Sequence, residues 1–189
     1  MRRIGILGDI GSGKSYIANS FGYPVFNADQ EVVEIYKKNK KVFIKLKKIL
    51  PKYIYSFPIN KYEITNAILS NKNNLKKIIK IVHFEVRKKM KLFLRKNRTK
   101  KFVILDIPLL LENKLNKKDD VLIFIDANKK NISKKLKKRK NFNLKLFYKF
   151  KKIQLPLAYK KQKSDFIIKN NFSKKGIKKD INKILDKIL

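Results

Sequence analysis

A glycine-rich stretch near the start of the chain limits its possible folds more than any other feature. Residues 8–15 read GDIGSGKS and complete the pattern G-x-x-x-x-G-K-[ST], directly after the apolar run Ile4–Leu7. An apolar run that leads into such a turn is typical of a buried strand followed by a phosphate-binding loop, whose backbone N–H groups converge on an anion. Glycine is needed there because a Cβ would block positive φ values or the close approach of phosphate. The pattern therefore predicts binding of a nucleoside triphosphate.

Two side chains of this loop are expected to carry chemistry. Lys14 would reach the β- and γ-phosphates, and the Ser15 hydroxyl would ligate Mg²⁺. A helix is expected to begin at Lys14 or Ser15. The alternative is a flexible Gly/Ser turn that matches by accident, but its place directly after an apolar run makes that interpretation the weaker one.

Short apolar runs rich in β-branched or aromatic residues recur along the chain and predict strands. The five runs are Ile4–Leu7, Pro24–Asn27, Phe102–Ile107, Val121–Asp126 and Phe166–Ile168. Amphipathic stretches lie between them, and strands that alternate with helices indicate a parallel α/β sheet. The long segment between the second and third runs has a mostly helical pattern. We expect it to form a helical insert at the carboxyl edge of the sheet, where ligands bind in such folds.

Positive charge dominates the composition. The formal net charge is +36, yet only six of the 50 basic residues are arginines, which phosphate- and base-reading surfaces usually favour. Lysine, isoleucine and asparagine are abundant along the whole chain, and A/T-rich codons encode all three. Base composition therefore explains the charge without a selected partner. We expect no specific nucleic-acid partner, only weak and salt-sensitive binding, although a nucleotide-dependent nucleic-acid-binding protein is the alternative from another class.

Other features of the composition narrow the class of protein. The chain has no cysteine, which excludes disulfides and thiolate metal sites. No apolar stretch approaches the ~20 residues that span a bilayer, and the chain begins in a strand instead of an apolar leader. We expect one domain over residues 1–189, no membrane association, a cytoplasmic location, and a monomer or weak homo-oligomer.

Three carboxylates lie near the ends of apolar runs and are candidate site residues. Asp29 comes directly after the second run, where it could accept or orient the proton of an attacking hydroxyl, or could cap the following helix. Asp106, near the end of the third run, could hold the water shell of a magnesium ion. Glu112 follows Leu109–Leu111, and a surface position is the simpler expectation for it.

Two further residues are unusual in this composition. Arg139 is the only arginine in the second half of the chain, within a lysine-dense helix. A guanidinium clamps phosphate oxygens bidentately and can stabilise a transferring phosphoryl group; the alternative is a solvated helix-face charge. His83 is the only histidine, and an apolar context favours a packed core residue over a metal ligand.

Taken in order, these segments resemble the dephospho-coenzyme A kinase family. IGILGDIGSGKS is similar to the family's T-G-G-I-G-S-G-K-S loop, YPVFNAD to P-V-I-D-A-D, IVHFEVR to an L-H-P segment and DIPLLLEN to P-L-L-F-E. Near the end, Gln154-Leu155-Pro156 with Lys160 resembles Q-x-P-x-x-x-K, and residues 164–171 resemble A-D-F-V-I-D-N-N. The ordered combination covers nearly the whole chain and is much more specific than the loop alone.

The resemblance implies a P-loop kinase fold with a parallel five-stranded sheet flanked by helices. It also implies a helical coenzyme A-binding insert over about residues 30–98 and a lid over about residues 128–145. The implied reaction is the last step of coenzyme A synthesis, in which ATP phosphorylates the ribose 3′-hydroxyl of dephospho-coenzyme A to give coenzyme A and ADP. Another P-loop nucleoside or nucleotide kinase is the runner-up, but such enzymes would place arginines around the acceptor phosphate, and arginine is scarce here.

The resemblance also implies catalytic roles. Asp29 takes the place of the family's proposed catalytic base, and Lys14 assists at the phosphates. Arg139 matches the lid arginine of an R-x-x-x-R segment whose first position is Lys135.

Binding roles follow in the same way. Ser15 and Asp106 are expected to hold Mg²⁺, and His83 and Lys160 are expected to contact the substrate. The residues expected to bind ATP are Gly8, Gly11, Ser12, Gly13, Lys14, Ser15 and Tyr16.

Several positions depart from the family pattern. Asn27 stands where the family usually has a first aspartate, and Phe84 replaces a proline. Tyr16 replaces the threonine after the loop serine, and Val33 occupies a site often held by arginine. We therefore expect lysines to replace some contacts to the coenzyme A phosphates.

Overall fold

The computed structural model describes residues 1–139 and 142–189, and the chain folds into two compact units. We call them the sheet unit and the helical unit. The sheet unit consists of Met1–Asn27, Asn97–Asn143 and Phe150–Leu189, and the helical unit consists of Ala28–Lys96 and Leu144–Lys149.

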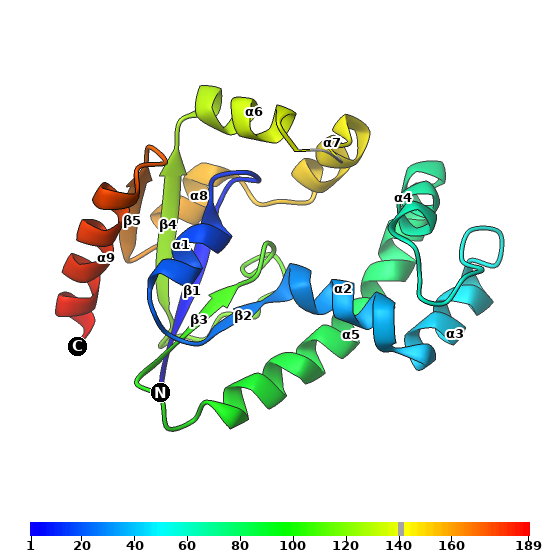
Figure 1. The fold of residues 1–189 in the computed structure, drawn as a ribbon, viewed down its shortest axis with the longest axis horizontal. Helices are drawn as coiled ribbons and strands as arrows, with labels where there is room; N and C mark the ends of the chain where they lie inside the picture. The colour runs from blue at the N-terminus through cyan, green and yellow to red at the C-terminus, as the bar shows by residue number, and fades with distance from the viewer. Residues whose placement is uncertain (140–141) are drawn as a thin grey trace. The chain divides into compact units, whose positions relative to one another are not determined.

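A five-stranded parallel sheet forms the centre of the sheet unit, with the strand order β2-β3-β1-β4-β5 (Figure 1). The strands are β1 (Arg2–Gly8), β2 (Val25–Asn27), β3 (Phe102–Asp106), β4 (Val121–Ala127) and β5 (Phe166–Asn170). Each of the five expected strands is confirmed, with ends that differ by at most two residues. Because all strands are parallel, their carboxyl ends share one edge of the sheet, where ligands bind in folds of this kind.

Among the described residues, four helices belong wholly to the sheet unit: α1 (Lys14–Ser20), α6 (Lys129–Lys137), α8 (Leu157–Gln162) and α9 (Lys174–Ile188). Helices α1 and α9 pack on one face of the sheet, over a core that includes Ile4, Ile6 and Ile123. The apolar face of α9 recurs every three or four residues at Ile177, Ile181, Ile184 and Ile188, all of which are buried. Helix α8 packs against β1.

The helical unit contains α2 (Ala28–Lys38), α3 (Lys40–Ile49), α4 (Lys61–Ser70), α5 (Lys72–Lys96) and the first six residues of α7 (Leu144–Lys152). Helices α2 to α5 occupy the stretch in which the sequence indicated a helical insert. Helix α5 buries a stripe of side chains at helical spacing, including Ile78, Val82 and Val86, and packs against α2, α3 and α4. None of the helices in the described part of the chain is both long enough and apolar enough to cross a membrane.

Candidate active site

The glycine-rich loop joins β1 to α1, as the sequence predicted. Gly8, Gly11 and Gly13 all have positive φ angles, and Gly13 precedes the first residue of α1 with φ 91°. A Cβ on Gly13 would lie 2.5 Å from Nδ2 of Asn170, and a Cβ on Gly8 would lie 2.9 Å from the carbonyl oxygen of Ile125. Glycine is therefore required by backbone conformation and by the close approach of neighbouring atoms.

Lys14 lies at the end of this loop, and its ammonium group folds back over it. Nζ donates hydrogen bonds to the carbonyl oxygens of Gly8, at 3.3 Å, and Asp9, at 2.7 Å. The carbonyl oxygen of Asp9 also accepts a hydrogen bond from the backbone N–H of Ser12, at 3.2 Å. These contacts place a positive charge beside the loop that the sequence predicts will hold a triphosphate.

Asp106 lies at the carboxyl end of β3 and is almost fully buried. Its Oδ2 accepts a hydrogen bond of 2.6 Å from Nδ2 of Asn27, its partner in the β2–β3 register. Burial raises the pKa of Asp106 above its ordinary value of 3.8, while a hydrogen bond from the Ser15 hydroxyl and the charge of Lys14 act in the opposite direction. The structure thus brings Asp106, which is distant in the sequence, to Ser15 and the neighbouring charge of Lys14.

The pairing of Ser15 with Asp106 suits a magnesium ion. Among the described residues, no three His, Cys, Asp or Glu side chains gather in a group that could hold a metal. Mg²⁺ does not need such a cage, because it usually keeps several waters and takes one or two protein ligands together with phosphate oxygens. One hydroxyl and one carboxylate in mutual contact at the end of the loop therefore fit this ion.

Asn170 fixes the conformation of the loop, and the sequence did not single it out as a site residue. It is the last residue of β5, and its Nδ2 donates a hydrogen bond of 2.7 Å to the carbonyl oxygen of the buried Ser12. Its Oδ1 accepts the backbone N–H of Phe172 at 2.8 Å. The position of Asn170 within the N-N motif at the end of a strand was the signal that could have identified it.

Glu112 and Lys160 form a buried ion pair in the sheet unit. Their charged atoms are 2.6 Å apart, and their side chains are only 9% and 1% exposed. The backbone N–H of Leu155 donates to the same oxygen of Glu112 at 3.0 Å. The expectation of a surface position for Glu112 is therefore wrong, because the carboxylate neutralises a buried lysine. A contact between Lys160 and substrate stays a prediction.

The segment expected to form the lid is described in part. Its helix is α6, and Arg139 follows this helix with an exposed side chain and a backbone N–H that donates to Leu136. Lys135 lies over the ring of Phe172, with Nζ 4.1 Å from the ring centre. Residues 140 and 141, which fall within the expected lid, lie outside the described residues.

Asp29 and His83 belong to the helical unit. Asp29 is the exposed second residue of α2, so it lies within the first turn instead of capping the helix. A carboxylate in the first turn interacts favourably with the helix dipole.

His83 is half-buried on α5, and desolvation together with the charge of Arg87 lowers its pKa, which favours the neutral imidazole. The remaining candidate, Tyr16, is exposed on α1.

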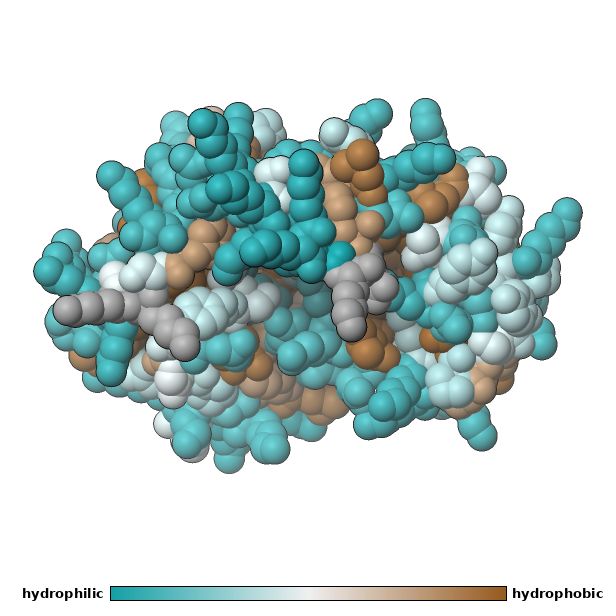
Figure 2. Space-filling model, turned by 45° about the horizontal axis from the view of Figure 1, so that its top comes forward, coloured by the Kyte–Doolittle hydropathy of each residue, from teal (hydrophilic) through white to brown (hydrophobic). Residues whose placement is uncertain are grey.

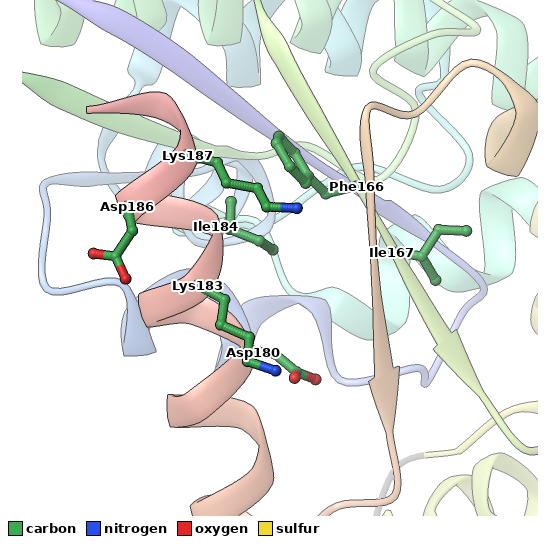
Figure 3. Close-up of a pocket in the computed structure, with 7 residues that line it drawn as sticks. All are labelled: Phe166, Ile167, Asp180, Lys183, Ile184, Asp186 and Lys187. Carbon is green, nitrogen blue, oxygen red and sulfur yellow. The ribbon is translucent and has the colours of Figure 1, made fainter.

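A hollow of about 540 Å³ lies between β5 and α9 (Figure 3). Its apolar lining comes from Phe166, Ile167 and Ile184. Two aspartates and two lysines of α9 complete the lining, so their charges cancel. A lining without net charge attracts a polyphosphate only weakly. None of the lining residues belongs to the glycine-rich loop.

Hydrophilic residues cover most of the face shown in Figure 2, with apolar residues scattered among them. The even spread matches a lysine excess that follows the whole sequence. Such a field attracts polyanions in general, and it does not identify a nucleic-acid interface.

Comparisons with known proteins agree with this geometry. A family model described as Dephospho-CoA kinase matches residues 2–175. The dephospho-CoA kinase of Wolbachia sp. subsp. Brugia malayi (strain TRS) is 33% identical over 190 residues, which cover 98% of this chain and 97% of the relative.

Two solved structures show the same fold. TT1252 from Thermus thermophilus has a TM-score of 0.78 at 23% identity, covering 100% of this chain and 97% of that one. Dephospho-CoA kinase from Campylobacter jejuni has a TM-score of 0.63 at 23% identity, covering 99% and 97%. The family match confirms the resemblance read from the motifs, and the chain belongs to the dephospho-CoA kinase family of enzymes.

Proposed function

We propose that this protein transfers the γ-phosphoryl group of ATP to the ribose 3′-hydroxyl of dephospho-coenzyme A. The observation that carries the proposal is the hydrogen bond between Ser15 and Asp106 at the end of a glycine-rich loop, where the charge of Lys14 also acts on Asp106, in a chain that the family model matches over residues 2–175. In the reaction, the 3′-oxygen forms a bond to the γ-phosphorus while the bond from that phosphorus to the β-phosphate oxygen breaks. ADP leaves, and the hydroxyl proton passes to a base.

The loop holds the donor. Backbone N–H groups of residues 8–15 and the ammonium of Lys14 would bind the triphosphate oxygens, and phosphate oxygens would then replace the carbonyl oxygens of Gly8 and Asp9 as acceptors for Lys14 Nζ. Ser15 and Asp106 would hold Mg²⁺, which when bound neutralises charge on the β- and γ-phosphate oxygens. Asp106 must be ionised for this role, although burial raises its pKa.

The acceptor hydroxyl needs a base, and Asp29 is the residue that we propose for it. It follows Asn27 by two residues, and Asn27 bonds directly to Asp106. An exposed carboxylate in a first helical turn can accept a hydrogen bond from a hydroxyl and so orient or deprotonate it. Arg139 would neutralise charge on the transferring group when the lid closes, and closure would exclude water as a competing acceptor.

The helical unit would bind the coenzyme A portion of the acceptor. His83 is the residue of this unit that is expected to contact the substrate. Lys160 belongs to the sheet unit, where its ammonium group is paired with Glu112, and its expected contact with the substrate stays a prediction. Lysines would replace arginines at some phosphate contacts, since Val33 occupies a site often held by arginine in the family. A lysine contacts phosphate as a point charge without the bidentate fork of arginine.

A coupled assay for ADP release tests the proposal. Dephospho-coenzyme A is compared with a panel of nucleoside monophosphates and nucleosides at equal concentration, with Lys14→Ala as the matched inactive control. Of the acceptors compared, we expect only dephospho-coenzyme A to support ADP release. Lys14→Ala should release no ADP with any acceptor, and its melting temperature should match that of the parent. Preferential use of a nucleoside monophosphate would assign the chain to another kinase class. Equal turnover by Lys14→Ala would exclude this loop as the catalytic one.

A further inference from the structure

The glycine-rich loop carries a negative charge that should oppose its ligand. Asp9 occupies the second position of the loop, where the family pattern T-G-G-I-G-S-G-K-S has glycine. Its side chain is only 13% exposed, and Oδ1 accepts the backbone N–H of Ile10 at 2.7 Å. A carboxylate fixed in the loop would repel triphosphate oxygens bound to the same loop.

Lys151 neutralises this carboxylate. Its Nζ lies 2.6 Å from Oδ1 and 2.5 Å from Oδ2 of Asp9, so one ammonium contacts both oxygens. Lys151 is the second-last residue of α7 and is separated from Asp9 by 142 positions. Lys14 donates to the backbone carbonyl of the same aspartate. Two ammonium groups therefore meet at the residue that brings the unfavourable charge.

We propose that Lys151 is a positioning residue of the nucleotide site, which keeps the loop able to accept a polyphosphate by neutralising Asp9. The inference rests on the proposed binding of ATP at this loop. Lys151 does not need to touch the nucleotide in this role, because its effect is exerted through the carboxylate. Loss of Lys151 alone should therefore be more harmful than loss of both members of the pair, since it leaves a charge without its partner.

Measurements of nucleotide affinity distinguish this positioning role of Lys151 from direct binding of phosphate, from a purely structural ion pair and from an effect of net charge. The affinity for a magnesium complex of a non-hydrolysable ATP analogue is measured by calorimetry at fixed ionic strength, without any acceptor. The test is therefore independent of which acceptor the enzyme uses, so failure of the proposed reaction and failure of this inference give different results. The proteins compared are the parent, Lys151→Ala, Asp9→Asn, the double variant and Lys152→Ala. Asp9→Asn keeps an acceptor for Ile10 N–H and removes only the charge.

Lys151→Ala should weaken binding by about tenfold, within the usual range for coupled charged groups. The double variant should return to within about threefold of the parent, and Asp9→Asn alone should bind no more weakly than the parent. Lys152→Ala removes an exposed lysine from the neighbouring position and should leave affinity unchanged, which controls for the net charge.

Three outcomes would overturn the inference. A double variant as weak as Lys151→Ala would mean that Lys151 binds phosphate itself. An unchanged affinity for Lys151→Ala would mean that the pair is only structural, and an equal loss with Lys152→Ala would assign the effect to net charge. Thermal melts check that each variant folds, and Lys151→Met, which keeps most of the aliphatic stem, replaces Lys151→Ala if that protein is unfolded.

Discussion

The side-chain amide of Asn27 donates a hydrogen bond of 2.6 Å to Oδ2 of Asp106, and so joins the carboxyl ends of two adjacent strands. The family pattern has an aspartate at the position of Asn27. In this protein a neutral donor therefore stands against a buried carboxylate whose pKa is already raised by desolvation. The hydrogen bond from Asn27 therefore stabilises the ionised form of Asp106.

Asn27→Asp would replace this hydrogen bond by repulsion between two carboxylates and would raise the pKa of Asp106 further. A pKa that is raised in the folded state lowers the free energy of unfolding at pH values above it, and the loss disappears as the pH falls through it. The melting temperature should therefore drop at pH 7 and recover at a more acidic pH, as the pH falls through the raised pKa, and Mg²⁺ should reduce the drop at pH 7. Asn27→Ala, which adds no charge, is the control. A loss that is equal at both pH values would contradict the repulsion.

Asp106→Asn should separate stability from activity. The folded-state pKa of Asp106 is raised by burial, so the ionised carboxylate destabilises the fold at neutral pH and a neutral amide removes that cost. The melting temperature at pH 7 should be unchanged or higher, while turnover should fall by about 10–100-fold, as expected when a group that orients a metal ion is lost.

The same shift predicts a pH dependence for the parent enzyme. Activity should decline on acidification through a pKa that lies above the ordinary aspartate value of 3.8, because protonated Asp106 cannot support Mg²⁺. A pH–rate profile at several magnesium concentrations measures it, and higher magnesium should move the decline to lower pH. If the pH at which activity declines does not depend on the magnesium concentration, the titrating group is not Asp106.

The sequence revealed those parts of the fold that local patterns determine. Short runs of β-branched and aromatic residues identified all five strands. The predicted range of the last strand ends two residues too early, at Ile168, because the strand continues through the polar residues Lys169 and Asn170. Such local patterns do not predict contacts between residues that are far apart in the sequence. Nothing near Glu112 indicates its pairing with Lys160, and a lysine-rich background conceals Lys151, whose ammonium group contacts the carboxylate of Asp9.

Asn170→Ala should weaken nucleotide binding by loosening the loop. The change leaves the carbonyl of the buried Ser12 without its 2.7 Å donor, and an unsatisfied buried group costs about 1–3 kcal/mol. We expect a lower melting temperature and a higher KM for ATP, with a smaller effect on kcat. Asn171→Ala, at an exposed neighbouring asparagine, is the matched control. Equal effects of the two changes would show that the Ser12 contact has no special role.

Asp29→Asn tests the proposed base. The change keeps the size of the side chain and removes its charge, so turnover should fall by about 10²–10⁴-fold. ATP affinity should barely change, and loss of a first-turn carboxylate should cost only about 0.3–1 kcal/mol of stability. Glu31→Gln removes the other acid of this turn and should retain turnover. Full turnover by Asp29→Asn would leave the reaction without an identified base.

Phosphorus NMR of the reaction mixture tests the proposed reaction most directly. With ATP, Mg²⁺ and dephospho-coenzyme A, a 3′-phosphomonoester resonance should grow in step with ADP, one for each ATP consumed, and Lys14→Ala should produce neither. Formation of ADP together with inorganic phosphate, or a phosphate ester at any position other than the ribose 3′-oxygen, would contradict it.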